Sequence, residues 1–129
     1  MKNLLFYTMM VLSIGAWAQQ QGTHTTDFVI LSSDLEFLDP IIETGASDVR
    51  DGHFRVVFFG RQVAEVTQPK MRDFIDRASK HKIELAVCEM SINRLGIDRD
   101  AIPKEFEIVG NVFLHSLQLQ QQGYKALHL

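Results

Sequence analysis

The chain has 129 residues, with 13 basic and 16 acidic side chains, a formal net charge of −3 and 46% hydrophobic residues. This length allows one domain. Phosphates require a basic binding face, so the acidic balance and the lack of any basic cluster with interleaved aromatic residues exclude a nucleic-acid partner from the prediction.

Residues 1–18 have the composition of a secretory signal peptide. Lys2 supplies a positive charge, residues 4–15 form an apolar run, and Ala16-Trp17-Ala18 fits the small-x-small pattern before a cleavage site. The apolar run is shorter than the roughly 20 residues that span a bilayer, which favours cleavage over a membrane anchor. We therefore expect a periplasmic or secreted protein with no membrane segment after cleavage, a flexible polar tail at residues 19–26, and one domain at residues 27–129.

The first half of this domain alternates apolar runs with helical patterns. Residues 27–31 predict a buried strand. A helical spacing of apolar residues follows from Leu35 to Ile42 behind the capping side chains of residues 32–34, but Pro40 predicts a crossover that is short and irregular or divided into two pieces. Residues 54–59 predict a second strand. Residues 60–61 predict a turn, and residues 69–80 an amphipathic helix.

The second half continues the alternation. Residues 83–87 predict a third strand, residues 89–95 a short helix ended by Gly96, and residues 106–109 a fourth strand. Asn111 is the expected N-cap of a helix that runs to Gln122, and residues 124–129 predict a short edge strand. This pattern predicts an α/β fold, a three-layer sandwich with a mostly parallel sheet of about five strands, and leaves the strand order open.

The search for reactive groups narrows to one residue, Cys88. The sequence contains no glycine-rich phosphate loop, no histidine pair with metal-ligand spacing and no G-x-S-x-G motif, so we predict neither a cofactor nor a metal. Cys88 is the only cysteine and ends the third predicted strand. Ligands usually bind at the carboxyl ends of strands in open parallel α/β sheets. The alternative is that Cys88 is a small buried side chain that closes the strand.

The residues around Cys88 resemble those of the DsrE/DsrF-like (YchN-like) sulfur-relay family. In that family a cysteine at a strand end is followed eight residues later by the glycine of an Arg-x-Gly-Ile turn, and here Arg94-Leu95-Gly96-Ile97 follows Cys88. The resemblance continues through Pro103, the strand at residues 105–110 and the ending LQLQQQGYKAL at residues 117–127.

The resemblance implies a small α/β subunit that forms homo-oligomers, either trimers or hexamers. In the sulfur-oxidising members it also implies that the cysteine carries sulfur as a persulfide. The sequence departs from the family at two places. Glu89-Met90-Ser91 replaces the Gly-Asn-Thr that many relatives carry after the cysteine, and Phe59 stands where many have a histidine.

Two functional hypotheses follow. In the first, the protein is an exported sulfur carrier in which Cys88 takes sulfur from a donor protein and passes it to an acceptor. The start of the following helix favours the thiolate form, whereas the carboxylate of Glu89 opposes it. Arg61 could anchor an anion, and Gly60, Glu89 and Ser91 complete the predicted substrate-binding site. In the second, the protein is a non-catalytic oligomeric module that binds a small ligand, and Cys88 is structural.

Overall fold

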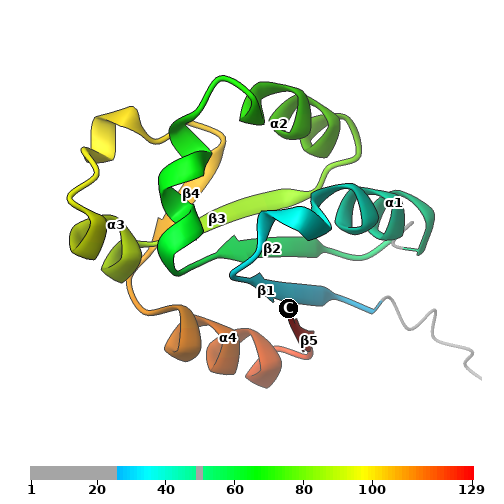
Figure 1. Ribbon diagram of the computed structural model, residues 1–129. Coiled ribbons are helices and arrows are strands. Elements are labelled where there is room, and N and C mark those ends of the chain that lie inside the picture. Colours follow the sequence, from blue (N-terminus) through cyan, green and yellow to red (C-terminus); the bar gives the residue numbers. More distant parts are fainter. Residues whose placement is uncertain (1–25, 49–50) are drawn as a thin grey trace, which may run out of the picture.

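The computed structural model of the protein describes residues 26–48 and 51–129 (Figure 1). The predicted signal peptide and all but the last residue of the predicted tail lie outside these residues. Within the described ranges, no helix is both long enough and apolar enough to cross a membrane.

Five parallel strands form one sheet in the order β4-β3-β2-β1-β5. The strands are β1 (Phe28–Ser32), β2 (Phe54–Phe58), β3 (Glu84–Cys88), β4 (Phe106–Val109) and β5 (Lys125–His128). Each lies within one residue of its predicted bounds or inside them. The α/β class and the parallel sheet of about five strands are confirmed, and β5 occupies an edge as predicted.

Four α-helices and three short 3-10 helices connect the strands in the described residues. They are η1 (Leu35–Phe37), α1 (Leu38–Asp48), η2 (Arg61–Thr67), α2 (Met71–Lys80), α3 (Glu89–Leu95), η3 (Arg99–Ala101) and α4 (Val112–Gln121). Figure 1 shows α1 and α2 on one side of the sheet and α4 on the other. This arrangement gives the three layers that the alternating pattern predicts.

The first crossover has two pieces, as one of the two alternatives for Pro40 predicts. Asp34 caps η1, since its carboxylate accepts a hydrogen bond of 2.8 Å from the backbone N–H of Glu36. The α-helix then begins afresh at Leu38, which places Pro40 in its first turn. Backbone N–H groups of a first turn have no partner within the helix, so the missing N–H of proline costs nothing there.

The prediction of a simple turn at residues 60–61 is wrong, because the chain after Gly60 forms a 3-10 helix, η2, over residues 61–67. Val63 and Val66 of this segment are buried against the core. Their three-residue spacing matches the repeat of a 3-10 helix, in which side chains three apart lie on the same side. Two apolar residues are too few to distinguish such a helix from a loop by pattern alone.

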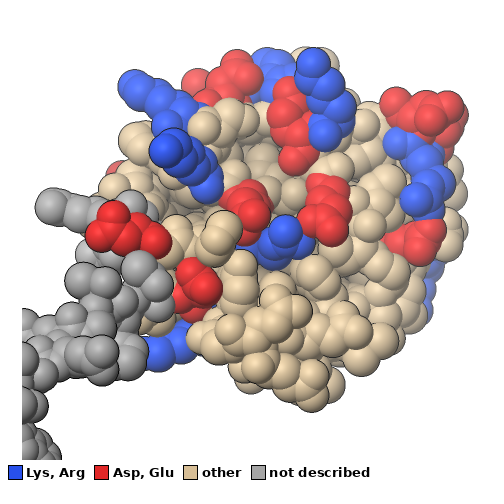
Figure 2. All heavy atoms as spheres, turned by 180° about the vertical axis from the view of Figure 1, so that it is seen from behind, with Lys and Arg blue, Asp and Glu red and all other residues tan. Residues whose placement is uncertain are grey.

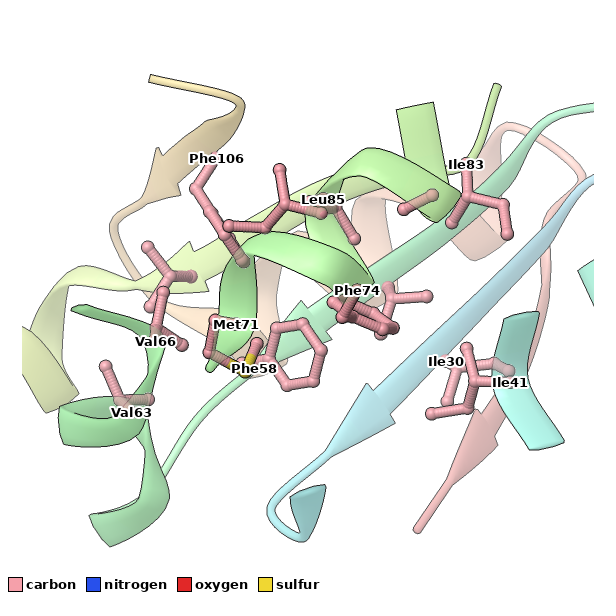
Figure 3. Packing of buried hydrophobic residues seen from close by; sticks show 14 of the residues in the cluster. Ile30, Ile41, Phe58, Val63, Val66, Met71, Phe74, Ile83, Leu85 and Phe106 are labelled. Atoms are coloured by element: carbon pink, nitrogen blue, oxygen red, sulfur yellow. The ribbon is translucent and has the colours of Figure 1, made fainter. Parts of the chain in front are cut away.

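The larger hydrophobic core lies between the sheet and the layer of α1, η2 and α2 (Figure 3). Phe58 of β2 is fully buried there and meets the ring of Phe74 of α2 edge to face, with centroids 5.9 Å apart and an interplanar angle of 77°. Met71, Ile75 and Ala78 complete the buried stripe of α2. The amphipathic pattern of residues 69–80 therefore predicted the packing face of this helix correctly.

The opposite face of the sheet has a smaller core. Val29, Leu31, Val57, Ala86 and Cys88 of the strands pack there against Val112 and Leu119 of α4. Figure 2 views the molecule from behind Figure 1, with charged side chains over its upper part and a lower central part without them, where α4 lies. Asn111 caps α4 as predicted, since its side-chain oxygen accepts hydrogen bonds from the N–H groups of Phe113 (3.0 Å) and Leu114 (3.3 Å).

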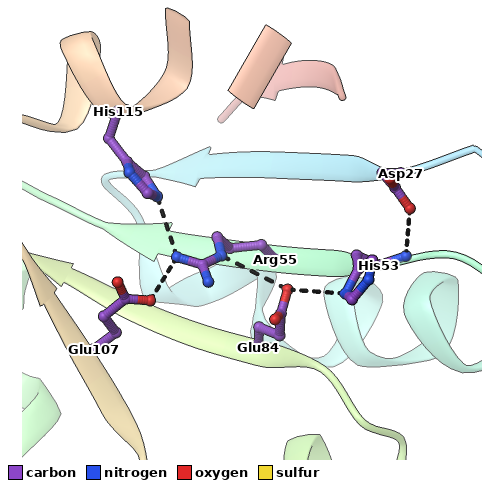
Figure 4. A network of polar contacts seen from close by, with 6 residues as sticks. All are labelled: Asp27, His53, Arg55, Glu84, Glu107 and His115. Atoms are coloured by element: carbon purple, nitrogen blue, oxygen red, sulfur yellow. Dashed lines mark hydrogen bonds and ion pairs between the residues drawn. The ribbon is translucent and has the colours of Figure 1, made fainter. Parts of the chain in front are cut away.

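A network of charged side chains lies on the same face, toward the amino ends of the strands (Figure 4). Arg55 of β2, whose side chain is 15% exposed, is at its centre and contacts Glu107 of β4 at 2.7 Å and Glu84 of β3 at 3.7 Å. Its Nη1 also lies 3.2 Å from Nε2 of His115 on α4. A guanidinium group can only donate, so Nε2 of His115 must be the unprotonated, accepting nitrogen. Arg55 thus links three elements, and this link requires a neutral His115.

The pKa of His115 is lowered, chiefly by burial and then by the positive charge of Arg55, with Glu107 acting in the opposite direction. A lowered pKa in the folded state means that the unfolded chain binds a proton first as the pH falls. The contribution of His115 to stability is therefore complete above the ordinary histidine pKa of about 6.5, and it is lost as the pH drops through that value toward the folded pKa.

We expect His115→Gln to flatten the pH dependence of stability on the acid side of neutrality. Glutamine keeps an acceptor for Arg55 but does not titrate. The measurement is the free energy of unfolding in urea at several values from about pH 7.5 down to about pH 5, a range that spans the histidine transition. The two proteins differ only at residue 115, so an unchanged slope would contradict the assigned role of His115.

Candidate functional site

Cys88 is the last residue of β3, and in the sheet register it pairs with Val109, the last residue of β4. Its backbone remains extended (φ −75°, ψ 120°) while it forms the N-cap of α3, and its side chain makes no capping hydrogen bond. The thiol points to the α4 side of the sheet, where only 2% of the residue is exposed. Cys88 is therefore at the strand end, as predicted, but nearly buried.

A cavity of about 300 Å³ opens beside this cysteine. Four segments contribute to its wall, namely the residues that follow β2, the end of β3, α3 and the start of α4. Its lining residues are Phe59, Gly60, Cys88, Met90, Ser91, Arg94, Val112 and Phe113. The cavity thus lies at the carboxyl edge of the sheet, where the α/β pattern places a ligand site.

Ser91 and Gly60 hold two walls of the cavity together. The N–H of Gly60 donates a hydrogen bond of 2.8 Å to Oγ of Ser91, which joins the loop after β2 to α3. Gly60 has φ 84° and ψ −162°, a conformation that residues with a side chain rarely adopt. The backbone therefore turns sharply at Gly60 and presents its N–H to α3.

Among the described residues, Arg94 is the only one with a charged side chain that lines the cavity. It lies on α3 three residues after Ser91, so the two side chains share one face of the helix. Arg94 is exposed and forms no ion pair within the part of the chain that the structure describes. By contrast, Glu89 at the start of α3 is paired with Arg99 of η3. The cavity therefore combines a thiol with a cation whose charge is not neutralised by a neighbouring carboxylate.

Two aromatic rings form the apolar side of the cavity. Phe59, which follows β2, and Phe113 of α4 meet edge to face with centroids 6.0 Å apart and an interplanar angle of 65°. Phe113 is 57% exposed, so this wall is open to solvent on its outer side. Phe59 stands where many relatives of the resembled family carry a histidine, and it gives this wall apolar rather than titratable character.

The structure brings together three of the predicted site residues. Cys88, Gly60 and Ser91 all line the cavity, although Gly60 and Ser91 bond to each other. Arg61 and Glu89 are not among its lining residues, since Arg61 is exposed on η2 and Glu89 is turned to Arg99. Sequence reasoning missed Arg94 as a site residue, although it recognised the turn that contains it. The helical spacing from Ser91 to Arg94 could have indicated their common face.

Two other findings bear on ligand binding. An apolar cavity of about 340 Å³ lies on the opposite face of the sheet, between α1 and the edge strand β5, with Phe28, Ile30, Phe54 and Leu127 among its lining residues. It is larger than the cavity at Cys88 and has no cysteine in its lining. Its only nucleophilic side chains among the described residues are those of Thr44 and Lys125. Among the described residues, no group of three or more His, Cys, Asp or Glu side chains is placed to hold a metal ion.

We expect Ser91→Ala to destabilise the protein by about 1 kcal/mol, because the partly buried N–H of Gly60 loses its acceptor. Loss of this bond also loosens the wall beside Cys88, so the thiol should react faster with iodoacetamide. Ser79→Ala is a matched control, since Ser79 is exposed on the outside of α2 and the change in helix propensity is the same. Equal effects of the two substitutions on unfolding and on alkylation would contradict the assigned link.

Comparison with known proteins gives a consistent picture. The model of the DsrE/DsrF-like family matches residues 41–129. The fold is similar to that of the protein of unknown function MTH1491 from Methanobacterium thermoautotrophicum, with a TM-score of 0.66 and 14% sequence identity over 80% of this chain and 100% of that one. No curated protein sequence matches the chain.

Proposed function

Because the chain belongs to the DsrE/DsrF-like family, we propose that it is a sulfur carrier that holds sulfur as a persulfide on Cys88. The observation that carries this proposal is the joint presence of Cys88 and Arg94 in the wall of one cavity. A sulfane donor such as thiosulfate is an anion, and an unneutralised arginine attracts anions and binds their oxygen atoms with paired N–H donors. Arg94 rather than Arg61 is therefore the proposed anion anchor.

The chemical step needs only the thiol and the donor. The thiolate of Cys88 attacks the outer sulfur of thiosulfate, a new S–S bond forms to Sγ, and the S–S bond of the donor breaks. Sulfite leaves with the electron pair, so Cys88 carries a persulfide anion. A thiolate of an acceptor protein then attacks the outer sulfur, which transfers it and restores the thiolate of Cys88. No external oxidant or reductant enters either step.

The cavity supports this cycle in two ways. Phe59 and Phe113 form an apolar wall beside the nearly buried thiol, and Arg94 places a positive charge on another wall, where a bound anion can contact it. The pairing of Glu89 with Arg99 engages the carboxylate that follows Cys88 in the sequence. This carboxylate is the feature that counts against thiolate formation when the sequence is considered alone.

Incubation of the full chain with thiosulfate should add the mass of one sulfur atom, and Cys88→Ser should abolish the addition. Arg94→Gln should slow the uptake severalfold, with a smaller difference at high salt because exposed charges are screened. Arg61→Gln is the matched control, since it removes an equal charge next to Gly60 but outside the cavity lining. Absence of the adduct at every pH where the thiol ionises would refute the carrier function. A larger effect of Arg61→Gln would return the anion anchor to Arg61.

A second candidate function has one observation in its favour. Cys88 is 2% exposed and packs in the smaller core with Val109 and Val112, as a purely structural side chain would. In a non-catalytic binding module the thiol would resist alkylation in the native protein, and Cys88→Ala would leave assembly and ligand binding intact. The rate of alkylation of the native protein as a function of pH distinguishes the two functions.

We also propose that the protein acts outside the cytoplasm, on the basis of the composition of residues 1–18. Oxidation of a thiol depends on its exposure, so the near-complete burial of Cys88 is compatible with an oxidising compartment. Cell fractionation with determination of the amino terminus should find the chain in the exported fraction, beginning after Ala18. Retention of an intact amino terminus in the cytoplasm would contradict export.

A further inference from the structure

The apolar cavity between α1 and β5 lies on the face of the sheet opposite to Cys88. β5 pairs with β1 in parallel, and in this register Leu127 pairs with Ile30. Paired residues of neighbouring strands point to the same face of a sheet, so Leu127 points to the side of the larger core, where Ile41 of α1 lies beside Ile30 (Figure 3). Ile30 is 6% exposed, whereas Leu127 is 54% exposed. The helical layer therefore covers β1 but ends before the edge strand.

The packing of α1 explains why this edge of the sheet is left open. Gly45 is buried, and a Cβ atom at this position would come within 2.9 Å of side-chain carbons of Phe54 and Ile83. Phe54 begins β2 and Ile83 directly precedes β3, so α1 packs tightly toward these two strands. Both strands lie on the side of β1 that is away from β5. The helix consequently leaves a cavity of about 340 Å³ beside β1 and β5.

Two polar side chains stand among the apolar residues of the lining. Lys125 begins β5, pairs with Phe28 in the register and is exposed. Its ammonium group forms no ion pair in the described part of the chain, and no acidic residue is among the described lining residues. The hydroxyl of Thr44 already donates a hydrogen bond of 2.8 Å to the carbonyl oxygen of Pro40. Lys125 thus supplies this apolar cavity with a cation whose hydrogen-bond donors are free for a ligand.

We propose that this cavity binds a free fatty carboxylate, with its apolar chain along Ile30 and Leu127 and its carboxylate on Lys125. Ligand sites are typically cavities of about 300 to 1,000 Å³, lined mostly by apolar side chains with a few polar groups that orient the ligand. The cavity has this volume and this composition. A neutral apolar ligand would leave the ammonium group without an anion, and a cationic ligand would be repelled by it. An amphiphile with an anionic end satisfies both parts of the lining.

Other occupants fit the cavity less well. Residues 19–25 precede β1 in the chain, but their sequence QQQGTHT is polar, whereas the lining is apolar. The apolar run at residues 4–15 belongs to the segment that we propose is removed on export. A second copy in a two-fold contact would bring Lys125 toward its own image, because each surface in such a contact meets itself. Only an anionic partner uses the positive charge.

Isothermal titration calorimetry of the full chain with decanoate measures this binding. We expect one decanoate per chain. The dissociation constant should fall by up to about fourfold for each CH₂ group added from hexanoate through octanoate to decanoate, because each group buries further apolar surface. Decan-1-ol and decyltrimethylammonium should bind at least about tenfold more weakly than decanoate, since neither offers an anion to Lys125.

Two substitutions in β5 separate the contributions of charge and apolar surface, and both residues are exposed, so the fold should persist. Lys125→Gln should raise the dissociation constant of decanoate about tenfold and leave that of decan-1-ol unchanged. Lys104→Gln is the matched control, since Lys104 is also exposed and precedes β4, the opposite edge strand.

Leu127→Ala should weaken the binding of decanoate and of decan-1-ol alike, because both chains contact this side chain. Leu114→Ala is its matched control and should change neither. Leu114 is 53% exposed, nearly as much as Leu127, but it lies on the outer side of α4, which also carries the exposed Phe113 and Leu117.

A full chain that takes up no decanoate would overturn the proposal, whether residues 1–25 or a second copy fill the cavity instead. An association that Leu127→Ala weakens in sedimentation equilibrium would then assign the cavity to a second copy. Equal binding of decanoate and decan-1-ol would also overturn it, as would normal binding of decanoate by both β5 variants. Cys88→Ser should bind decanoate as the unaltered chain does, so none of these results bears on the uptake of sulfur from thiosulfate.

Discussion

The chain must return from β4 at one edge of the sheet to β5 at the other, across β3, β2 and β1. A single helix, α4, makes this connection, and it is the helix that packs on the smaller core. The earlier crossovers place α1, η2 and α2 against the other face. One face of the sheet is therefore thickly covered, whereas the other depends on one helix. Much of the remaining structure follows from this imbalance.

The thinly covered face of the sheet is covered in two different ways along the strands. Near the carboxyl ends, α4 covers Leu31, Val57 and Cys88 with apolar side chains. Nearer the amino ends, Arg55 lies over the sheet and its charge is balanced by Glu84 and Glu107 of the neighbouring strands. The carbon stem of an arginine covers apolar surface while its charged group remains paired or hydrated. His115 joins the two regions, because it belongs to α4 and contacts Arg55.

The same imbalance gives Cys88 its surroundings. The residue ends β3 on the thinly covered face, at the point where α4 begins beside it. The thiol is therefore buried by few layers of side chains, and one of the covering residues, Phe113, is itself largely exposed. This position explains why Cys88 is buried like a core residue and yet lines a cavity whose wall also contains the cationic side chain of Arg94.

Much of the fold could be predicted from the sequence, because it depends on contacts that are local in the chain. The five strands, the buried stripe of α2, the capping residues Asp34 and Asn111 and the strand-end position of Cys88 all follow from runs, spacing and caps. The family resemblance likewise rested on short motifs around Cys88 and Gly96. The 3-10 helix at residues 61–67 was not predicted, because its two buried valines are too few to show a helical period.

The tertiary structure alone decided the strand order and the composition of the site. The distance between segments in the sequence does not tell which strands become neighbours, since parallel pairing depends on the path of each crossover. Only the folded chain brings Arg94 to the cavity, turns Glu89 to Arg99 and leaves Arg61 outside the lining. Periodicity predicts which side of an element is apolar, but not what covers it. For this reason the exposed apolar side of α4 became apparent only when the sheet it packs on was known.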